Sequence, residues 1–346
     1  MIRLKAAYLK AHRLFEVRDI QLRPIQDDEV IVDVKACGYC GHDNILANYQ
    51  AKEWEPFGHE FSGVVSEVGN AVKNVKVGDS VCIETATFDP LCDCARNGRP
   101  DLDNVPRGAS FMELDKGHRG GMGFAERAIV PAALCVKYSG MTFEEACIME
   151  PLGVAYDLWM TADIKMNNDV LVYGCGPIGL MALQMAKRSG ARKIYAAEFS
   201  TATRRIELAR QFGADEIIFT DKTDIENFSF EKGGVDRVLM TAPPKFIGNA
   251  CNVMNPGGIL AFLGISYNEP MVVFDSNKVH LNKLQIRGSN AIPALYFPII
   301  IDLVKAGMID VKSLISHRMH LNTLPEDLAE YYSEPDKAVK AVMINN

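Results

Sequence analysis

A glycine-rich segment in the second half of the chain constrains the fold most strongly. It opens with a short apolar run, Asp169–Tyr173, which predicts a buried strand. Gly174, Gly176 and Gly179 follow in a GxGxxG spacing, and a helical pattern begins at once. The first glycine permits a tight turn, the second lets a pyrophosphate approach the backbone, and the third lets helix and strand pack closely. A strand, a glycine turn and a helix in this order predict a Rossmann βαβ unit that binds a dinucleotide.

The residues around this turn favour NAD over NADP. Pro177 and Ile178 stand at the helix start, whose free N–H groups would hold a phosphate. Glu198 ends the next strand, where its carboxylate can accept hydrogen bonds from a ribose diol and would repel a 2′-phosphate. Arg204, a candidate cofactor contact, and Arg205 follow, and they keep NADP as an alternative. The remaining interpretation is an ordinary βαβ unit with a glycine-rich turn.

Length and composition indicate a soluble globular protein of two domains. The chain has 346 residues, 48% hydrophobic and 23% charged. A net charge of −7 argues against nucleic acid as a partner. No apolar run approaches the roughly 20 residues that a bilayer requires, and the N-terminus has early charges and no secretory core, so we expect a cytoplasmic protein without a membrane partner. The nine cysteines then predict metal ligands or core residues rather than disulfides.

Strand and helix patterns alternate around the glycine turn and predict a doubly wound parallel sheet. The expected elements are helices at Val154–Ala162 and Thr201–Phe212, strands at Glu216–Phe219, Gly234–Met240 and Ile259–Gly264, and a turn at Asn255–Gly258. Because ligands of such sheets bind at the carboxyl ends of the strands, we expect Leu263, Gly264 and Ile265 to approach the cofactor.

The first half has strand patterns without crossover helices and predicts a β-rich domain. The expected strands are Lys5–Leu9, Glu16–Ile20, Glu29–Ala36, Phe61–Val68 and Ser80–Glu84. A helix at Phe143–Met149, capped by Thr142 and Glu145, should lead into a hinge at Glu150–Gly153. After about Ser289 we expect a return to the first domain through a helix at Ala294–Ala306 and strands at Ser313–Leu321 and Ala338–Ile344. The predicted domains are 1–152, 153–288 and 289–346.

Two polar motifs in the first half contain zinc-type ligands. Cys40 lies in a GYCGHD motif, and His59 and Glu60 lie in a GHE motif. A catalytic zinc takes three such protein ligands and leaves one position for water or substrate. A buried cysteine beside a hydrogen-bonded histidine is an equal alternative on spacing alone.

The order of motifs resembles the zinc-dependent medium-chain dehydrogenases. The matching segments are Gly38–Asp43, Gly58–Glu60, Gly121–Glu126, Glu150–Leu152 and the nucleotide fold. The resemblance spans nearly the whole chain and is strongest to the polyol and threonine dehydrogenase branch. It implies an α/β protein with a GroES-like β-rich catalytic domain and a Rossmann domain, assembled as a homodimer or homotetramer.

The resemblance also implies a site and a reaction. Cys40 and His59 would be catalytic zinc ligands, and Glu60 or Glu150, or the two alternately, would supply carboxylate oxygen. A hydride would pass from a secondary alcohol of polyol, sugar or sugar-acid type to NAD, leaving a ketone. Glu150, with zinc-bound water, or His42 would carry the proton away. Only eighteen residues separate Cys40 from His59, which is short for the family.

Three departures from the family pattern bear on this expectation. First, His42 stands where the family has Ser or Thr as a proton relay. An imidazole has a pKa suited to the same task, so we predict that His42 is the relay or a base. The alternative is a histidine that only shapes the pocket.

Second, the cysteines of the family's structural zinc lobe are largely missing. Alignment places Asp89, Cys92, Ala95 and Asp103 at the four ligand positions, with Cys94 out of register. We therefore predict one catalytic zinc, no structural zinc, and an irregular excursion over residues 90–116 at a subunit contact or the site entrance. A site for another metal at Cys92 and Cys94 is the alternative.

Third, the Arg-Tyr pair typical of sorbitol dehydrogenases is replaced by Arg287-Gly288-Ser289-Asn290. Sorbitol itself is therefore a doubtful substrate, although another secondary alcohol is not.

Two rival interpretations of the protein's function remain. One is a zinc-free quinone or enone reductase that uses NADPH, against which the Cys40, His59 and Glu150 set argues. The other is a nucleotide-binding sensor that has lost catalysis.

Overall fold

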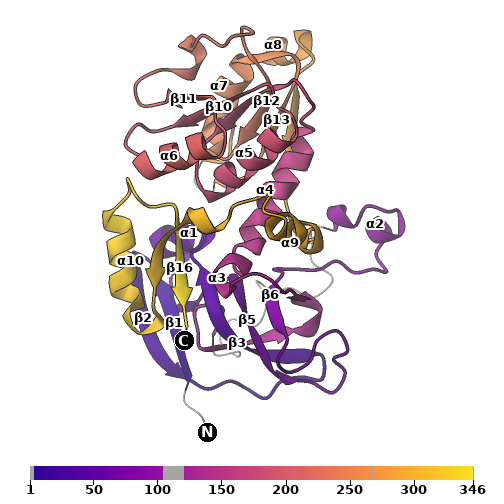
Figure 1. The fold of residues 1–346 in the computed structure, drawn as a ribbon, viewed down its shortest axis with the longest axis vertical. Coiled ribbons are helices and arrows are strands. Elements are labelled where there is room, and N and C mark those ends of the chain that lie inside the picture. The colour runs from indigo at the N-terminus through magenta and orange to yellow at the C-terminus, as the bar shows by residue number, and fades with distance from the viewer. Residues whose placement is uncertain (1–3, 104–120, 267–268, 346) are drawn as a thin grey trace.

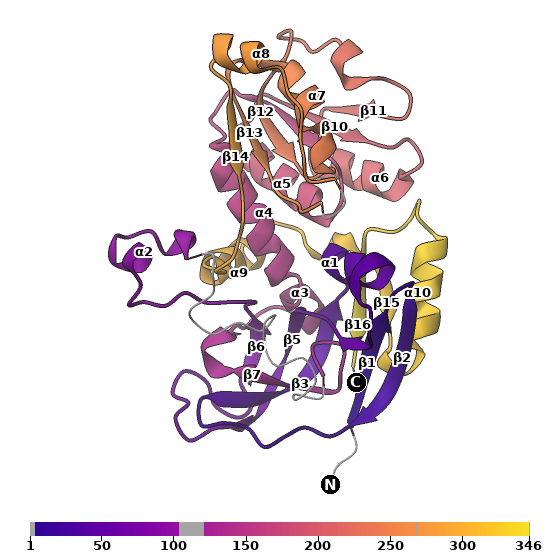
Figure 2. The same cartoon turned by 180° about the vertical axis from the view of Figure 1, so that it is seen from behind.

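The structure is a computed structural model, and it describes residues 4–103, 121–266 and 269–345. A parallel sheet flanked by helices lies above a β-rich body, and the long helix α4 (Met149–Ala162) runs between them (Figure 1). The C-terminal segment lies against the β-rich body, beside the first strands of the chain (Figure 2).

The upper sheet confirms the predicted doubly wound fold. In chain order its strands are β9 (Asp169–Tyr173), β10 (Lys193–Glu198), β11 (Glu216–Phe219), β12 (Val235–Met240), β13 (Met254–Phe262) and β14 (Gln285–Gly288). They are all parallel, in the order β11-β10-β9-β12-β13-β14. The order reverses between β9 and β12, which is where ligands of such sheets bind.

Both faces of β9 are buried, which explains its continuous apolar sequence. Val170 and Val172 point into a core shared with α4 and with α5 (Pro177–Arg188). Leu171 and Tyr173 point into the opposite core, shared with α7 (Ile247–Asn252).

The β-rich body contains two sheets. In chain order its strands are β1 (Leu4–Lys10), β2 (Leu14–Ile20), β3 (Glu29–Gly38), β4 (Glu55–Pro56), β5 (Glu60–Val68), β6 (Ser80–Ile83), β7 (Arg127–Pro131), β8 (Cys135–Lys137), β15 (Ile315–Met319) and β16 (Lys340–Ile344). One sheet has the order β2-β1-β4, and the other has the order β15-β16-β3-β5-β6-β8 with β7 paired to β3. The late strand β16 thus pairs with β3 from the first fifth of the chain, placing Val342 opposite Gly38.

The remaining elements connect and cover these sheets. The other α-helices are α1 (Gly41–Ile45), α2 (Asp93–Arg96), α3 (Phe143–Ala146), α6 (Thr203–Gln211), α8 (Ser276–Leu281), α9 (Phe297–Lys305) and α10 (Leu324–Ser333). A π-helical segment covers Leu46–Gln50, and single 3₁₀ turns cover Pro100–Leu102, Ala132–Leu134, Ile225–Asn227, Pro244–Phe246, Lys312–Leu314 and Leu321–Thr323.

Two local predictions were wrong. The expected hinge at Glu150–Gly153 is the start of α4, because a proline such as Pro151 is tolerated in a first turn whose N–H groups have no helical acceptors. The expected turn at Asn255–Gly258 lies inside β13, where it forms a bulge: Val235 pairs with Met254, but Arg237 pairs with Ile259.

Two global features complete the description. None of the helices in the described ranges has the length and apolar character that a membrane crossing requires. All nine cysteines are unpaired, and most of them are buried.

Candidate active site

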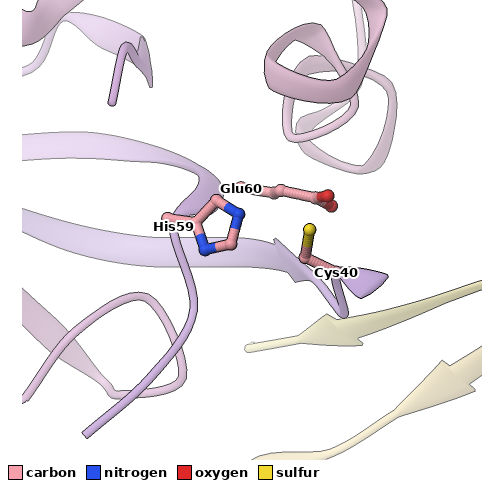
Figure 3. A group of neighbouring side chains, drawn as sticks. All are labelled: Cys40, His59 and Glu60. Atoms are coloured by element: carbon pink, nitrogen blue, oxygen red, sulfur yellow. The ribbon is translucent and has the colours of Figure 1, made fainter. Parts of the chain in front are cut away.

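Three side chains with zinc-type donor atoms converge on one point. The ligand atoms of Cys40, His59 and Glu60 all lie within 4.8 Å of one another. His59 and Glu60 are buried, and the Cys40 sulfur faces both of them (Figure 3). The residues predicted from the two polar motifs are therefore brought together by the fold.

Strand pairing explains this convergence. Cys40 follows β3 and forms the N-cap of α1, while Glu60 opens β5. Because β3 and β5 pair with Gly38 opposite Glu60, the eighteen intervening residues loop away and return to the same place. A Cβ at Gly38 would lie 2.3 Å from Glu60 Oε2, so a larger residue there would have to displace the Glu60 side chain.

Asp43 contacts both Cys40 and His59. Its Oδ2 accepts a hydrogen bond from the Cys40 backbone N–H at 3.1 Å, completing a capping box, and its Oδ1 lies 3.7 Å from His59 Nδ1. Carboxylates beside a histidine ligand commonly orient its ring. We did not predict this role, although the position of Asp43 three residues after the N-cap is a signal that could have indicated it.

The buried charges of this cluster shift one another. Burial raises the pKa of the Cys40 thiol, and the neighbouring His59 opposes the rise. Burial alone would lower the pKa of His59, but the charges of Cys40 and Asp43 raise it well above its ordinary value. Cys40, His59 and Asp43 are therefore close enough for their charges to shift one another's pKa values.

Lys340 is a fourth member of the cluster. It is buried, its Nζ forms an ion pair with Glu60 Oε2, and the same Nζ donates to the Tyr39 carbonyl at 3.1 Å. Burial would lower its pKa, but Glu60 and Cys40 raise it above the ordinary value. Lys340 was not predicted, because it reaches the site only through the pairing of β16 with β3.

Glu150 lies in the first turn of α4 and is half-buried. Burial, reinforced by Glu60, raises the pKa of its carboxyl to about 7, although His59 and Lys340 oppose the shift. Its charge and that of His59 influence each other, so the predicted second carboxylate is near the cluster.

His42 lies beside Cys40 and His59. It is in the first turn of α1, where its backbone N–H donates to Cys40 Sγ at 3.4 Å. Its ring centroid lies 6.1 Å from that of His59.

The glycine turn has the close contacts that its spacing predicts. Gly174 has a φ of +100°, and a Cβ on Gly179 would lie 2.0 Å from the Gly174 carbonyl oxygen. Gly176, the N-cap of α5, faces open space, with nothing within 4 Å of an added Cβ. Helix and strand are thus packed tightly, and the free N–H groups at the start of α5 are accessible.

Glu198 ends β10 beside this turn, as predicted. Its two carboxylate oxygens accept the backbone N–H groups of Cys175 at 3.0 Å and Phe199 at 2.9 Å. Arg205 Nη1 lies 3.7 Å from Glu198 Oε2. Arg204 instead pairs with Glu207 on the surface of α6.

A cavity of about 480 Å³ connects the two halves of the site. Its inner end is lined by Cys40, Glu60 and Lys340. Its other wall is formed by residues of the nucleotide sheet, which are Gly176, Pro177, Ile178, Gly179, Arg205, Thr241 and Leu263. Of the segment after β13, Leu263 lines this cavity, whereas Ile265 is 70% exposed.

The region of the missing zinc lobe is held by ordinary hydrogen bonds where it is described. Cys92 Sγ accepts the Ala95 backbone N–H at 3.4 Å, and the buried Asp103 accepts that of Asp89 at 3.0 Å. Residues 104–116 of the predicted excursion lie outside the described residues. In the described parts of the chain, the Cys40 group is the one cluster of three potential metal ligands.

Comparison with known proteins agrees with this geometry. The family model described as "Alcohol dehydrogenase GroES-like domain" matches residues 26–140, and that described as "Zinc-binding dehydrogenase" matches residues 177–306. The chain is 31% identical over 315 residues to an L-threonine 3-dehydrogenase of Caldanaerobacter subterraneus subsp. tengcongensis, with 87% of each chain covered. It is 26% identical over 358 residues to an L-idonate 5-dehydrogenase of Vitis vinifera, covering 98% of this chain and 93% of the relative.

A solved structure is similar over the same extent. The 2R,3R-butanediol dehydrogenase from Bacillus subtilis superposes with a TM-score of 0.82 at 26% identity, covering 99% of this chain and all of that chain. The chain therefore belongs to the zinc-binding dehydrogenase family with a GroES-like domain, in its polyol and threonine dehydrogenase branch.

Proposed function

We propose that this oxidoreductase converts a secondary alcohol to a ketone with NAD, at a zinc ion held by Cys40, His59 and Glu60. The observation that carries the proposal is the convergence of these three donors, two of which, Cys40 and Glu60, line a cavity whose other wall is the glycine turn. A thiol, an imidazole and a carboxylate are ligand types that zinc prefers, so the donor set fits this metal.

When bound, a zinc ion lowers the pKa of a hydroxyl group that it polarises, and NAD accepts a hydride at its nicotinamide ring. The protein's own residues would supply the rest. Asp43 orients the His59 ring, and Lys340 compensates the charge of Glu60. The cavity walls hold the substrate between this cluster and the nucleotide turn.

Glu150 and His42 are the proposed proton carriers. A carboxyl with a pKa of about 7 can accept a proton and return it near neutral pH, which suits Glu150. Glu150 is also the proposed alternative to Glu60 as a carboxylate ligand. His42 would pass a proton along α1, away from the cavity.

The nucleotide would bind across the glycine turn. We propose contacts from Gly174, Gly176, Pro177, Ile178, Gly179 and Glu198, with Leu263, Gly264 and Ile265 near the nicotinamide. A carboxylate at position 198 supports NAD, because it disfavours a 2′-phosphate. Arg205, rather than Arg204, is the arginine on the cavity wall that would assist NADP.

The substrate class is supported by what the relatives act on. Threonine, idonate and butane-2,3-diol each carry a secondary hydroxyl group, and the proteins named for them align with nearly the whole chain. We therefore propose a polyol, sugar or sugar-acid substrate. The cluster of zinc-type ligands argues against the interpretation as a zinc-free reductase. The cavity and the cluster together argue against a sensor that has lost catalysis.

Steady-state turnover of secondary alcohols, polyols and sugar acids tests the proposal. We expect NAD-dependent oxidation that a chelator abolishes and added zinc restores. Binding of NADH without turnover of any tested compound would instead support the non-catalytic sensor. Oxidation of NADPH by enones that a chelator does not stop would support the zinc-free reductase.

We also propose that the protein is a cytoplasmic homodimer or homotetramer. Unpaired cysteines support a reducing compartment. Exposed apolar side chains gather along the chain between β13 and the end of α8, namely Ile265, Met271, Val273 and Leu281. Such surfaces often mark subunit contacts, and light scattering on the purified protein would measure the assembly.

A further inference from the structure

The cavity wall beside Cys40 is built from aromatic and hydrogen-bonding side chains of separate elements. Arg13 comes from the turn between β1 and β2, Asn44 from α1, and Tyr332 from α10. Tyr39, next to Cys40, completes this wall. None of these residues has a role in the reaction proposed above.

A chain of hydrogen bonds fixes which atoms this wall presents. Arg13 Nε donates to Asn48 Oδ1 at 2.7 Å, and because arginine can only donate, Asn48 must present its oxygen there. Asn48 Nδ2 then donates to Asn44 Oδ1 at 2.8 Å. The Tyr332 hydroxyl donates to the same oxygen at 2.9 Å.

The consequence is that Asn44 offers a donor and no free acceptor. Its oxygen already accepts two hydrogen bonds, so its Nδ2 is the remaining polar atom, and within the described chain no partner is assigned to it. The Tyr332 hydroxyl lies 2.5 Å from that of Tyr39 and, since its own proton is given to Asn44, it accepts the hydrogen bond from Tyr39.

Arg13 is an exposed residue, and within the described part of the chain no hydrogen bond is formed by its two terminal nitrogens. Its Cζ lies 4.2 Å from the centroid of the Tyr332 ring, and its backbone N–H donates to the Ala47 carbonyl at 2.6 Å. The described residues place no carboxylate within ion-pair distance of its guanidinium. A guanidinium held by stacking and one hydrogen bond presents a planar pair of donors, which matches the oxygens of a carboxylate or phosphate.

The charges lining the cavity also favour an anion. They are three cations, Arg13, Arg205 and Lys340, and one carboxylate, Glu60. Lys340 is paired with Glu60, and Arg205 lies near Glu198 beside the nucleotide turn. Arg13 is therefore the uncompensated cation on the wall next to Cys40.

We propose that Arg13 and Asn44 bind an anionic group, a carboxylate or a phosphate, carried by the alcohol substrate. Asn44 lies four residues after Cys40, about one helical turn or 5.4 Å along α1. The anion would then stand a few carbon atoms from the hydroxyl that reacts. This inference rests on the proposed function, since it assigns the substrate class of the same site.

The test compares matched compounds of four to six carbons: each polyol, its aldonate and its terminal phosphate. For the zinc-loaded enzyme we expect kcat/KM for one anionic series to exceed that of the neutral polyols by about tenfold or more, mainly through KM, as a charge-assisted hydrogen bond allows. A higher kcat/KM for the aldonates would identify the bound group as a carboxylate, and a higher kcat/KM for the terminal phosphates would identify it as a phosphate. Arg13→Gln should abolish this preference, and Arg13→Lys should restore it only in part, because lysine lacks the planar fork.

Controls separate this inference from the proposed function. Arg210→Gln, which removes an exposed arginine from the last turn of α6, should keep the anion preference. Equilibrium binding of the same compounds to the NADH-bound protein gives a second readout that needs no turnover, and the preference should fall at high salt. Equal binding of anionic and neutral compounds by the unmodified protein, or an unchanged preference in Arg13→Gln, would overturn the inference while leaving the dehydrogenase intact. Weaker NADH binding by Arg13→Gln with no change in preference would assign Arg13 to the cofactor and also overturn it.

Discussion

Lys340 and Glu60 form a buried ion pair that joins the last strand of the protein to its candidate zinc site. The two residues lie 280 positions apart in the sequence, and the pairing of β16 with β3 brings them together. The C-terminal segment thus supplies a side chain that contacts the candidate zinc site.

Replacing Lys340 by methionine should destabilise the protein strongly. The change leaves Glu60 buried without its partner, and such a loss costs about 3 kcal/mol or more. Denaturant unfolding of the zinc-free protein measures the free energy difference. Lys337→Met is the matched control, because it removes an exposed pair with Glu334 and should cost about 0.5 kcal/mol or less. Equal stability of the two variants would show that the buried pair contributes nothing.

Replacing His42 by phenylalanine should slow turnover about 100-fold if His42 relays the proton. The fold should remain, since the ring is similar in size and the α1 cap uses backbone atoms and the side chains of Cys40 and Asp43, not that of His42. His320→Phe, at an exposed position directly after β15, is the control that should leave kcat unchanged. Near-normal turnover of His42→Phe would reduce this histidine to a pocket-shaping role.

Replacing Gly179 or Gly176 of the nucleotide turn by alanine should have different effects on stability and on NADH binding. Gly179→Ala places a Cβ 2.0 Å from the Gly174 oxygen, so both the melting temperature and NADH binding should fall. Gly176→Ala meets open space in the free protein and an extended backbone that alanine accepts, so stability should be kept. Its methyl group should nevertheless weaken NADH binding by about tenfold, because it occupies space needed by the pyrophosphate. Unchanged NADH binding by Gly176→Ala, measured by fluorescence titration, would contradict the proposed position of the cofactor.

Glu84 should make the protein less stable as the pH rises. Burial raises the pKa of this carboxyl to about 8 in the folded protein, whereas its ordinary value is 4.5. The folded state therefore binds more protons than the unfolded state between these values, and stability is lost as the pH rises through that window.

Glu84→Gln removes this dependence. The free energy of unfolding of the variant minus that of the unmodified protein should rise by about 2–3 kcal/mol from pH 5 to pH 8.5. This range allows for the partial exposure of Glu84. Chemical unfolding of chelated protein at both pH values checks this, with the exposed Glu67→Gln as control. A constant difference across the pH range would show that Glu84 ionises normally.

The sequence alone predicted those parts of the protein that depend on local chemistry. The glycine turn, the strand before it and Glu198 after it form one continuous segment, so spacing was enough to place them. The Cys40 and His59 motifs were recognisable for the same reason, although their meeting depends on the pairing of β3 with β5.

The parts that were not predicted depend on distant contacts. Lys340 and Arg13 reach the site from opposite ends of the chain, and no spacing signals such a meeting. The start of α4 was predicted as a hinge, whereas the structure continues the helix through Pro151, because a first turn tolerates proline. The cofactor and zinc contacts of individual residues, and the domain boundaries, remain predictions.

Metal content per chain, measured by mass spectrometry, tests the central claim most directly. The unmodified protein and Cys94→Ser should each hold about one zinc ion, and Cys40→Ser should hold almost none while remaining folded. Two zinc ions, one of which is lost in Cys94→Ser, would show that the interpretation of residues 89–103 is wrong. A folded protein that binds NADH and contains no zinc would contradict the zinc dehydrogenase mechanism.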